Sequence, residues 1–362
     1  MNKKYASAAR TVLGTMRDDL YQSNLKRTLQ TDIRELKDFM LSEEQMNRLA
    51  AMTRFRRWVF VSLWLLRSLY FKLTSVRRLF IVAGIILLLM DVNSGSLSIN
   101  TNHIAGGILI LFILMLELKD KLLAQEELHA GHSVQQALMP ERDPQVPGWE
   151  LWLYTRPANE VGGDFVDFVK ISQERYGAIL GDVAGKGLSA ALLTAKLQST
   201  LRALVSDTES LETLTDKINR IFYRDSPRNI FASLIYIDFQ PLSGQVKLIN
   251  AGHIPPVVLK SSGMEKLEKG GLAIGLTSCA KYKEQVLELQ PGETLIVYSD
   301  GVTEARNEKK EFFGEERLGF MLPHISKNSA RDMGEQIIYN VDMFIGEAKA
   351  YDDVSLIILK RK

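Results

Sequence analysis

The sequence predicts an α+β protein in which two antiparallel sheets form a β-sandwich flanked by helices, preceded by an all-α N-terminal region. Short apolar runs typical of strands occur at residues 150–154, 176–181, 232–239, 245–250, 294–299 and 354–359. Helical spacing of apolar residues occurs at residues 188–206, 211–223 and 331–345. Strands that cluster around hairpin turns, with the helices grouped apart, indicate this class.

The composition indicates a folded chain with two dissimilar halves. Its 362 residues, 46% hydrophobic and 24% charged, are enough for two domains. Residues 1–78 contain 16 Lys and Arg against 7 Asp and Glu, a balance of +9, so a total of +2 leaves about −7 for the rest. The one cysteine, Cys279, excludes an internal disulfide and a Cys-based metal cluster, and fits a reducing cytoplasm.

Residues 1–75 are predicted to form a basic, helical module on the cytoplasmic side of a membrane. Their positive charges alternate with helix-type apolar residues and precede hydrophobic runs, which favours an anionic membrane surface over nucleic acid as the partner. Within this module, residues 58–66 are apolar and aromatic but are followed by Arg67 and Lys72, as in an interfacial amphipathic helix.

Residues 76–118 are predicted to form a transmembrane helical hairpin. The apolar runs 79–90 and 104–116 have 12 and 13 residues, and they approach the roughly 20 residues of a span only if they are extended toward a turn at 93–100. Basic residues outside both runs place both ends in the cytoplasm, which predicts a multi-pass protein of the inner (cytoplasmic) membrane. The alternative is a buried helical pair in a soluble dimerisation domain.

Residues 119–139 are predicted to form a helical linker between the hairpin and a C-terminal domain at 140–362. The helical pattern of 117–138 offers Leu118, Leu122, Leu128 and Val134 as a seam, which predicts a homodimer through the linker. Three prolines at 140, 144 and 147 end the helix.

Acidic residues recur at the ends of the predicted apolar strands, beside glycine or another acid: Asp164, Asp182, Asp300, and Asp352 with Asp353. Carboxylates held close together repel each other and are costly to bury, so such a set indicates a bound divalent cation. Oxygen ligands without His or Cys favour Mg²⁺ or Mn²⁺ over zinc. Two such ions can share and activate a water molecule for attack on a phosphorus atom. Glycines at 162, 163, 181 and 301 allow sharp turns there, and let the Val183 carbonyl approach as a ligand.

Five segments, at residues 157–168, 181–191, 250–256, 298–305 and 352–356, resemble the motifs of the SpoIIE/RsbU branch of the metal-dependent protein phosphatase 2C (PPM) family, in the family order. The resemblance implies that Asp182, with the Val183 carbonyl, bridges two Mn²⁺ or Mg²⁺ ions, that Asp300 and Asp352 complete the inner shell, and that Asp164 assists the second ion. Asp353 is a neighbouring candidate ligand.

The same resemblance implies a protein-serine/threonine phosphatase. The family's substrates are phosphoserine or phosphothreonine proteins, typically the anti-sigma-factor antagonist (STAS-type) of a partner-switching pathway. In related enzymes a helical linker dimerises and repositions the first catalytic helices, so the linker is expected to control assembly of the metal site. The alternatives are a membrane-tethered pseudophosphatase that binds a phosphoprotein without turnover, and a chain whose N-terminal half is the functional sensor.

Four further polar residues lie in or near the motifs, at positions 156, 167, 186 and 253. For His253, a structural role in its loop is favoured over contact with the substrate or proton donation to the leaving group of the substrate. Lys186 contacts phosphate or is a solvated turn residue. Asp167 caps its local turn, and Arg156 is a nearby cation outside any matched motif, which leaves the phosphate anchor unassigned.

Overall fold

The structure, a computed structural model, describes residues 37, 40–50, 52–89, 101–208 and 210–362. The chain divides into two compact units, Met1–Leu122 and Leu123–Lys362, which we describe separately.

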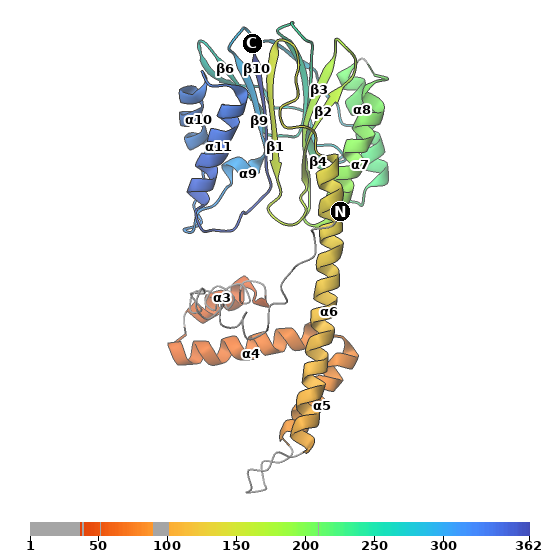
Figure 1. Cartoon of the computed structure of the whole chain (residues 1–362), viewed down its shortest axis with the longest axis vertical. Coiled ribbons are helices and arrows are strands. Elements are labelled where there is room, and N and C mark those ends of the chain that lie inside the picture. Colours follow the sequence, from red (N-terminus) through yellow and green to blue (C-terminus); the bar gives the residue numbers. More distant parts are fainter. Residues whose placement is uncertain (1–36, 38–39, 51, 90–100, 209) are drawn as a thin grey trace, which may run out of the picture. The chain divides into compact units, whose positions relative to one another are not determined.

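The C-terminal unit contains two five-stranded antiparallel sheets (Figure 1). The first has the order β1-β10-β9-β6-β7, with β1 Trp149–Arg156, β10 Val354–Arg361, β9 Thr294–Tyr298, β6 Val257–Lys260 and β7 Gly263–Lys266. The second has the order β2-β3-β4-β5-β8, with β2 Asp164–Lys170, β3 Tyr176–Val183, β4 Ala232–Phe239, β5 Gln245–Ala251 and β8 Gln285–Glu288.

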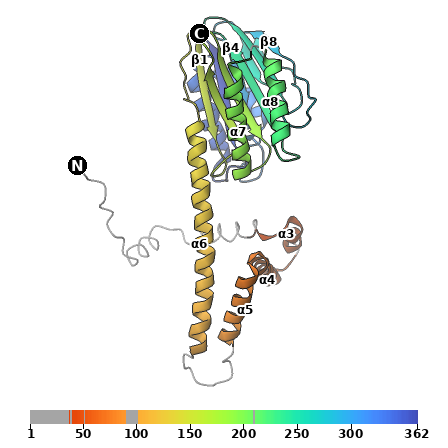
Figure 2. The same cartoon turned by 90° about the vertical axis from the view of Figure 1, so that its right-hand side faces the viewer.

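Helices cover the outer face of each sheet, so the unit has four layers (Figure 1), and the helices over the second sheet lie in front in Figure 2. The second sheet is covered by α7 (Leu188–Val205) and α8 (Leu211–Asp225), and the first by α9 (Asp300–Thr303), α10 (Gly314–Ile325) and α11 (Ala330–Ile345). Buried apolar residues fill the three interfaces between these layers. The middle interface is made by alternate residues of strands in both sheets, as the two-residue period of a strand requires.

The prediction of an α+β sandwich is confirmed. The sequence prediction did not include β2, the short strands β6, β7 and β8, or α10. Strand β2 begins at Asp164, where the sequence was interpreted as a metal-binding turn, and the three other strands have only four residues each. Runs of that length have too few alternations to reveal a period.

The N-terminal unit is helical in the part that the structure describes. It contains α3 (Glu43–Ala50), α4 (Arg54–Lys72), α5 (Ser75–Leu89) and the first part of α6 (Thr101–Leu138). A small core of Leu41, Leu49 and Val61 joins α4 to the segment before it. Arg77 joins α5 to α6 through ion pairs with Glu117 and Asp120, at 2.5 and 2.6 Å. The apolar positions that the sequence suggested at residues 20–36 lie outside the described residues.

Among the described residues, no helix has both the length and the apolar character needed to cross a bilayer. The transmembrane hairpin expected over residues 76–118, and the membrane localisation inferred from it, are therefore not supported. The described part of α5 covers Ser75–Leu89, and the apolar run in α6 is followed at once by Glu117. The turn expected at 93–100 lies outside the described residues.

Candidate metal centre

The predicted acidic residues lie at one end of the sandwich because of the strand pairing. In the second sheet, Asp164 at the start of β2 is the direct partner of Asp182 near the end of β3. In the first sheet, Asp300 follows β9, and Asp352 and Asp353 precede β10, which pairs antiparallel with β9. Each sheet thus delivers carboxylates from two neighbouring strands to the same rim.

The acidic residues of both sheets interact electrostatically. Burial, followed by repulsion from Asp300, Asp352 and Asp353, raises the pKa of Asp182 to about 6. Burial and the charges of Asp182 and Asp353 raise the pKa of Asp164 well above its ordinary value. Burial is also the first cause of the raised pKa values of Asp300 and Asp353. All four groups are therefore destabilised as anions by their surroundings.

Asp353 holds the loop before β2 through backbone hydrogen bonds. One carboxylate oxygen, Oδ1, accepts from the Ala158 N–H at 2.7 Å, and Oδ2 accepts from the N–H groups of Gly163 and Asp164 at 2.7 and 3.2 Å. A Cβ atom at Gly162 would lie 2.2 Å from Oδ2, so only glycine leaves room for this contact. These bonds make Asp353 a clamp between the two sheets, a role that the sequence interpretation did not assign to it.

The Asp182 carboxylate and the Val183 carbonyl approach the same point of the backbone. A Cβ atom added to Gly163 would lie 2.6 Å from the Val183 oxygen and 3.3 Å from Asp182 Oδ1. Gly163 is held in place by its own carbonyl, which accepts from the Val183 N–H at 3.1 Å and from Thr194 Oγ1 at 2.8 Å. The absence of a side chain at Gly163 therefore lets two oxygen ligands approach the same small space.

The residues present fit a hard divalent cation. Every candidate donor is an oxygen, and Asp164 Oδ2 is buried with no hydrogen-bond partner among the described residues. Buried carboxylates with raised pKa values become stable anions only when a cation compensates their charge. The described acids do not form a ready group of three or more His, Cys, Asp or Glu side chains around a single point. The ligand assignments to Asp164, Asp182, Val183, Asp300 and Asp352 remain predictions.

Lys186 lies at the edge of this acidic rim. Its Nζ atom is 3.6 Å from Asp352 Oδ2 and 5.3 Å from the centroid of the Tyr351 ring. Arg306 stacks on the same ring. The sequence interpretation named Lys186 but missed Tyr351 and Arg306, although Tyr351 directly precedes Asp352 and Arg306 directly follows the segment 298–305.

His253 is buried in its loop. Asn250 holds it by accepting from the His253 N–H at 2.8 Å and donating to the His253 carbonyl at 3.0 Å. Burial lowers the pKa of His253 to about 4, so the imidazole is neutral near pH 7. Only 8% of the His253 surface is exposed, which favours a structural role over contact with substrate.

Two charged residues near the motifs form structural ion pairs. Arg156 donates to both carboxylate oxygens of Asp342 on α11, at 3.0 and 2.6 Å, so its donors are engaged away from the acidic rim. Asp167 is fully buried and accepts two hydrogen bonds from Arg202 on α7, at 2.7 and 2.6 Å. Asp167 therefore joins β2 to α7, in addition to accepting from the next N–H of its own strand.

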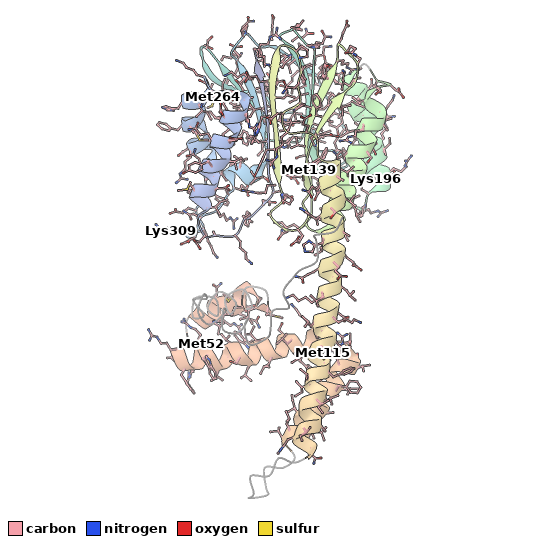
Figure 3. The ribbon with its side chains drawn as sticks, in the orientation of Figure 1. Met52, Met115, Met139, Lys196, Met264 and Lys309 are labelled. Carbon is pink, nitrogen blue, oxygen red and sulfur yellow. The ribbon has the colours of Figure 1, made fainter. Side chains whose placement is uncertain are left out.

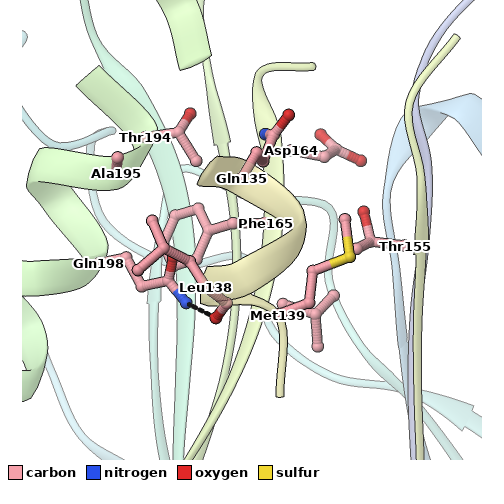
Figure 4. Close-up of a pocket in the computed structure, with 10 residues that line it drawn as sticks. Gln135, Leu138, Met139, Thr155, Asp164, Phe165, Thr194, Ala195 and Gln198 are labelled. Carbon is pink, nitrogen blue, oxygen red and sulfur yellow. Dashed lines mark hydrogen bonds between the residues drawn. The ribbon is translucent and has the colours of Figure 1, made fainter. Parts of the chain in front are cut away.

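The end of α6 that belongs to the C-terminal unit contacts the metal-site loop directly. The Gln135 side chain donates to the Gly162 carbonyl at 3.0 Å and accepts from the Gly162 N–H at 3.2 Å. One turn later, the Leu138 carbonyl accepts from Gln198 on α7 at 2.9 Å. Gln135, Leu138 and Asp164 line one cavity of about 10 Å³ (Figure 4). No motif marks Gln135 in the sequence, so sequence reasoning missed it.

The raised carboxyl pKa values predict how the metal-free protein responds to pH. A carboxyl group whose folded pKa exceeds its unfolded value stabilises the fold when protonated and loses that contribution as pH rises. For Asp182 the window runs from its ordinary value of 3.8 to about 6. In chelator at pH 7.5, Asp182→Asn is expected to raise the melting temperature by a few degrees, and near pH 4 the difference should largely vanish.

The control for this prediction is Asp207→Asn, which changes an exposed aspartate after α7. The melting temperature of Asp207→Asn should equal that of the wild type at both pH values. A lower melting temperature for Asp182→Asn than for wild type at pH 7.5 would contradict the repulsion described above.

Comparisons with known proteins agree with this architecture. The model of the SpoIIE family (Stage II sporulation protein E) matches residues 172–362, more than half of the chain. Protein IcfG of Synechocystis sp. is 29% identical, over 69% of this chain and 45% of its own length. Phosphoserine phosphatase RsbU of Bacillus subtilis is 27% identical, over 66% of this chain and 71% of its own length. The chain thus spans less than half of IcfG.

Solved structures show the same fold. The SiaA-PP2C domain of Pseudomonas aeruginosa has a TM-score of 0.58 at 18% identity, with 67% of this chain and 99% of that domain covered. The RsbU and RsbW domains of a Mycobacterium tuberculosis protein have a TM-score of 0.52 at 22% identity, with 60% and 61% covered. On the match to the family model, the chain belongs to the SpoIIE family.

Proposed function

We propose that this chain is a metal-dependent serine/threonine protein phosphatase that hydrolyses a phosphoserine or phosphothreonine protein. The observation that supports it best is the convergence of buried and half-buried carboxylates from both sheets, whose raised pKa values call for cationic compensation. Its homologues RsbU and RsbP of Bacillus subtilis are phosphoserine phosphatases by name. By this similarity, the proposed substrate is an anti-sigma-factor antagonist of a partner-switching pathway.

In this proposal, Asp164, Asp182, Asp300, Asp352 and the Val183 carbonyl hold two Mn²⁺ or Mg²⁺ ions. When bound, such ions activate water and neutralise charge on the phosphoryl group. The chain's own contribution is to place the ligands. Asp353 holds the loop at Gly163 by accepting its N–H, and thereby sets the separation of the two sheets at the rim. The closely placed carboxylates are the reason why the site attracts cations without His or Cys ligands.

Phosphatase activity is tested by release of phosphate from p-nitrophenyl phosphate and from a phosphoserine protein by the full chain, with Mn²⁺ or Mg²⁺. Asp182→Asn and Asp300→Asn should each lower the rate by at least about 100-fold because each removes a charged ligand. Asp207→Asn should retain wild-type activity.

If the wild-type chain releases no phosphate with either cation, the phosphatase proposal fails. A phosphoprotein that still binds to the inactive chain would then favour a pseudophosphatase that acts as a binding module.

We further propose that the linker helix α6 controls the order of the metal site and that α6 dimerises. Gln135 supports the first part because it holds the backbone of Gly162, whose neighbour Gly163 faces the Asp182 carboxylate. Leu118, Leu122 and Val134 of the predicted seam support the second because each is more than half exposed on α6, whereas Leu128 is partly buried. A displacement of this helix would remove both bonds to Gly162 and loosen the loop, which would keep its bonds to Asp353.

Gln135→Ala is expected to weaken Mn²⁺ binding by about threefold to tenfold, because two neutral hydrogen bonds to the loop are lost. Gln136→Ala is the matched control because it removes the exposed glutamine next along the helix. Mn²⁺ affinity is measured by calorimetry on the full chain. Equal affinities of the two variants would contradict the proposed role of Gln135.

A further inference from the structure

A stacked arginine lies next to the acidic rim, outside the predicted set of ligands. The Arg306 guanidinium carbon lies 3.4 Å from the centroid of the Tyr351 ring and 4.7 Å from that of Phe312. Tyr351 directly precedes Asp352 in the chain. An arginine that stacks on an aromatic face keeps the edge of its guanidinium group, where the N–H donors lie, free for an anion. The stack therefore fixes a planar cation on the ring of Tyr351, the residue that directly precedes the candidate ligand Asp352.

Arg306 differs from Arg156 and Arg202 in that its guanidinium group is not paired with a carboxylate. Arg156 and Arg202 each donate two hydrogen bonds to a carboxylate, of Asp342 and Asp167 respectively. Among the residues that the structure describes, Arg306 has no such carboxylate partner, and its Nε atom is buried without a hydrogen-bond partner. The positive charge of Arg306 is therefore not compensated by a paired carboxylate, and an incoming anion that meets the outer nitrogens of the guanidinium would compensate it.

A second cation lies near the same ring. Lys186 Nζ is 5.3 Å from the Tyr351 centroid, and 3.6 Å from Asp352 Oδ2. Lys186 thus interacts with the acidic rim itself, whereas Arg306 does not pair with any described carboxylate. Charge compensation of the rim explains Lys186 but leaves Arg306 unexplained. Two cations close to one ring, beside a site for divalent ions, suit a doubly charged anion with several acceptor oxygens.

We propose that Arg306, positioned by Tyr351 and assisted by Lys186, is the residue that binds the phosphoryl group of the substrate. The proposal rests on the proposed phosphatase function and answers which cation anchors the phosphate, since Arg156 is engaged with Asp342. The guanidinium fork matches two oxygens of a phosphate monoester, as a lysine ammonium does not. Arg306 therefore determines affinity for the phosphoryl group, and the carboxylates determine affinity for the cations.

The test compares Arg306→Gln and Arg306→Lys with wild type in the full chain loaded with Mn²⁺. Calorimetry measures binding of inorganic phosphate without turnover, and kinetics give KM and kcat for a phosphoserine peptide. Arg306→Gln should weaken phosphate binding and raise KM by about 10-fold to 100-fold, the range for a hydrogen bond to a charged group. The phosphate affinity and KM of Arg306→Lys should lie between those of the wild type and Arg306→Gln, because lysine keeps the positive charge but loses the two-pronged guanidinium geometry.

Lys309→Gln is the matched control, because Lys309 is an exposed cation that follows Arg306 by three residues (Figure 3). It should leave KM and phosphate binding unchanged. Mn²⁺ affinity should also be unchanged in every variant, whereas a merely structural role for Arg306 would lower it. If Arg306→Gln does not fold, the test rests on Arg306→Lys, whose melting temperature should equal that of the wild type.

Unchanged phosphate affinity and KM in the Arg306 variants would overturn the proposal while the phosphatase function stands. A wild type that hydrolyses no phosphoester, yet binds phosphate in a manner that depends on Arg306, would support the anion site and refute the phosphatase. A wild type that binds no phosphate at all would overturn the anion site.

Discussion

Mutual repulsion among carboxylates that are buried (Asp164, Asp353) or half-buried (Asp182, Asp300, Asp352) is the constraint on which the acidic rim of the C-terminal unit depends. Asp164 and Asp182 come from one sheet, and Asp300, Asp352 and Asp353 from the other. Burial and these charges together raise the pKa values of Asp164 and Asp182. Such an arrangement destabilises a sandwich that binds nothing, and neutral residues at the same positions would avoid that cost. The cost is understandable where binding of cations offsets it.

The Asp353 clamp ties the loop before β2 to the first sheet at the acidic rim. Its carboxylate accepts three backbone N–H groups of the loop before β2, which stabilise its anionic form although burial acts against it. The same loop is held from its other side by Gln135 of α6 through Gly162. One short glycine-containing segment thus connects the acidic rim with the linker helix, so that order in the helix can affect order in the metal site.

The sequence allowed prediction of the sandwich and of the acidic rim, because strand periodicity and the motifs around Asp164, Asp182 and Asp300 are local signals. The Asp353 clamp and the Gln135 contact could not be predicted, because they depend on backbone groups distant in the sequence, 195 residues away for Asp353 and Ala158. Arg156 directly precedes the segment 157–168, and only the structure shows that Asp342 engages it. The hairpin prediction relied on the hydropathy of two short runs, and among the described residues no helix has both the length and the apolar character of a span.

The most direct test of the account is calorimetric titration of Mn²⁺ into the chelator-treated full chain at pH 6, in two buffers of different ionisation enthalpy. The account predicts binding that releases protons, because the pKa of Asp182 is about 6 without metal and cation binding favours its ionised form. Proton release should decrease at pH 8 and in Asp182→Asn. Absence of Mn²⁺ and Mg²⁺ binding, or binding without proton release at pH 6, would contradict the claim that the carboxylate rim is a metal centre.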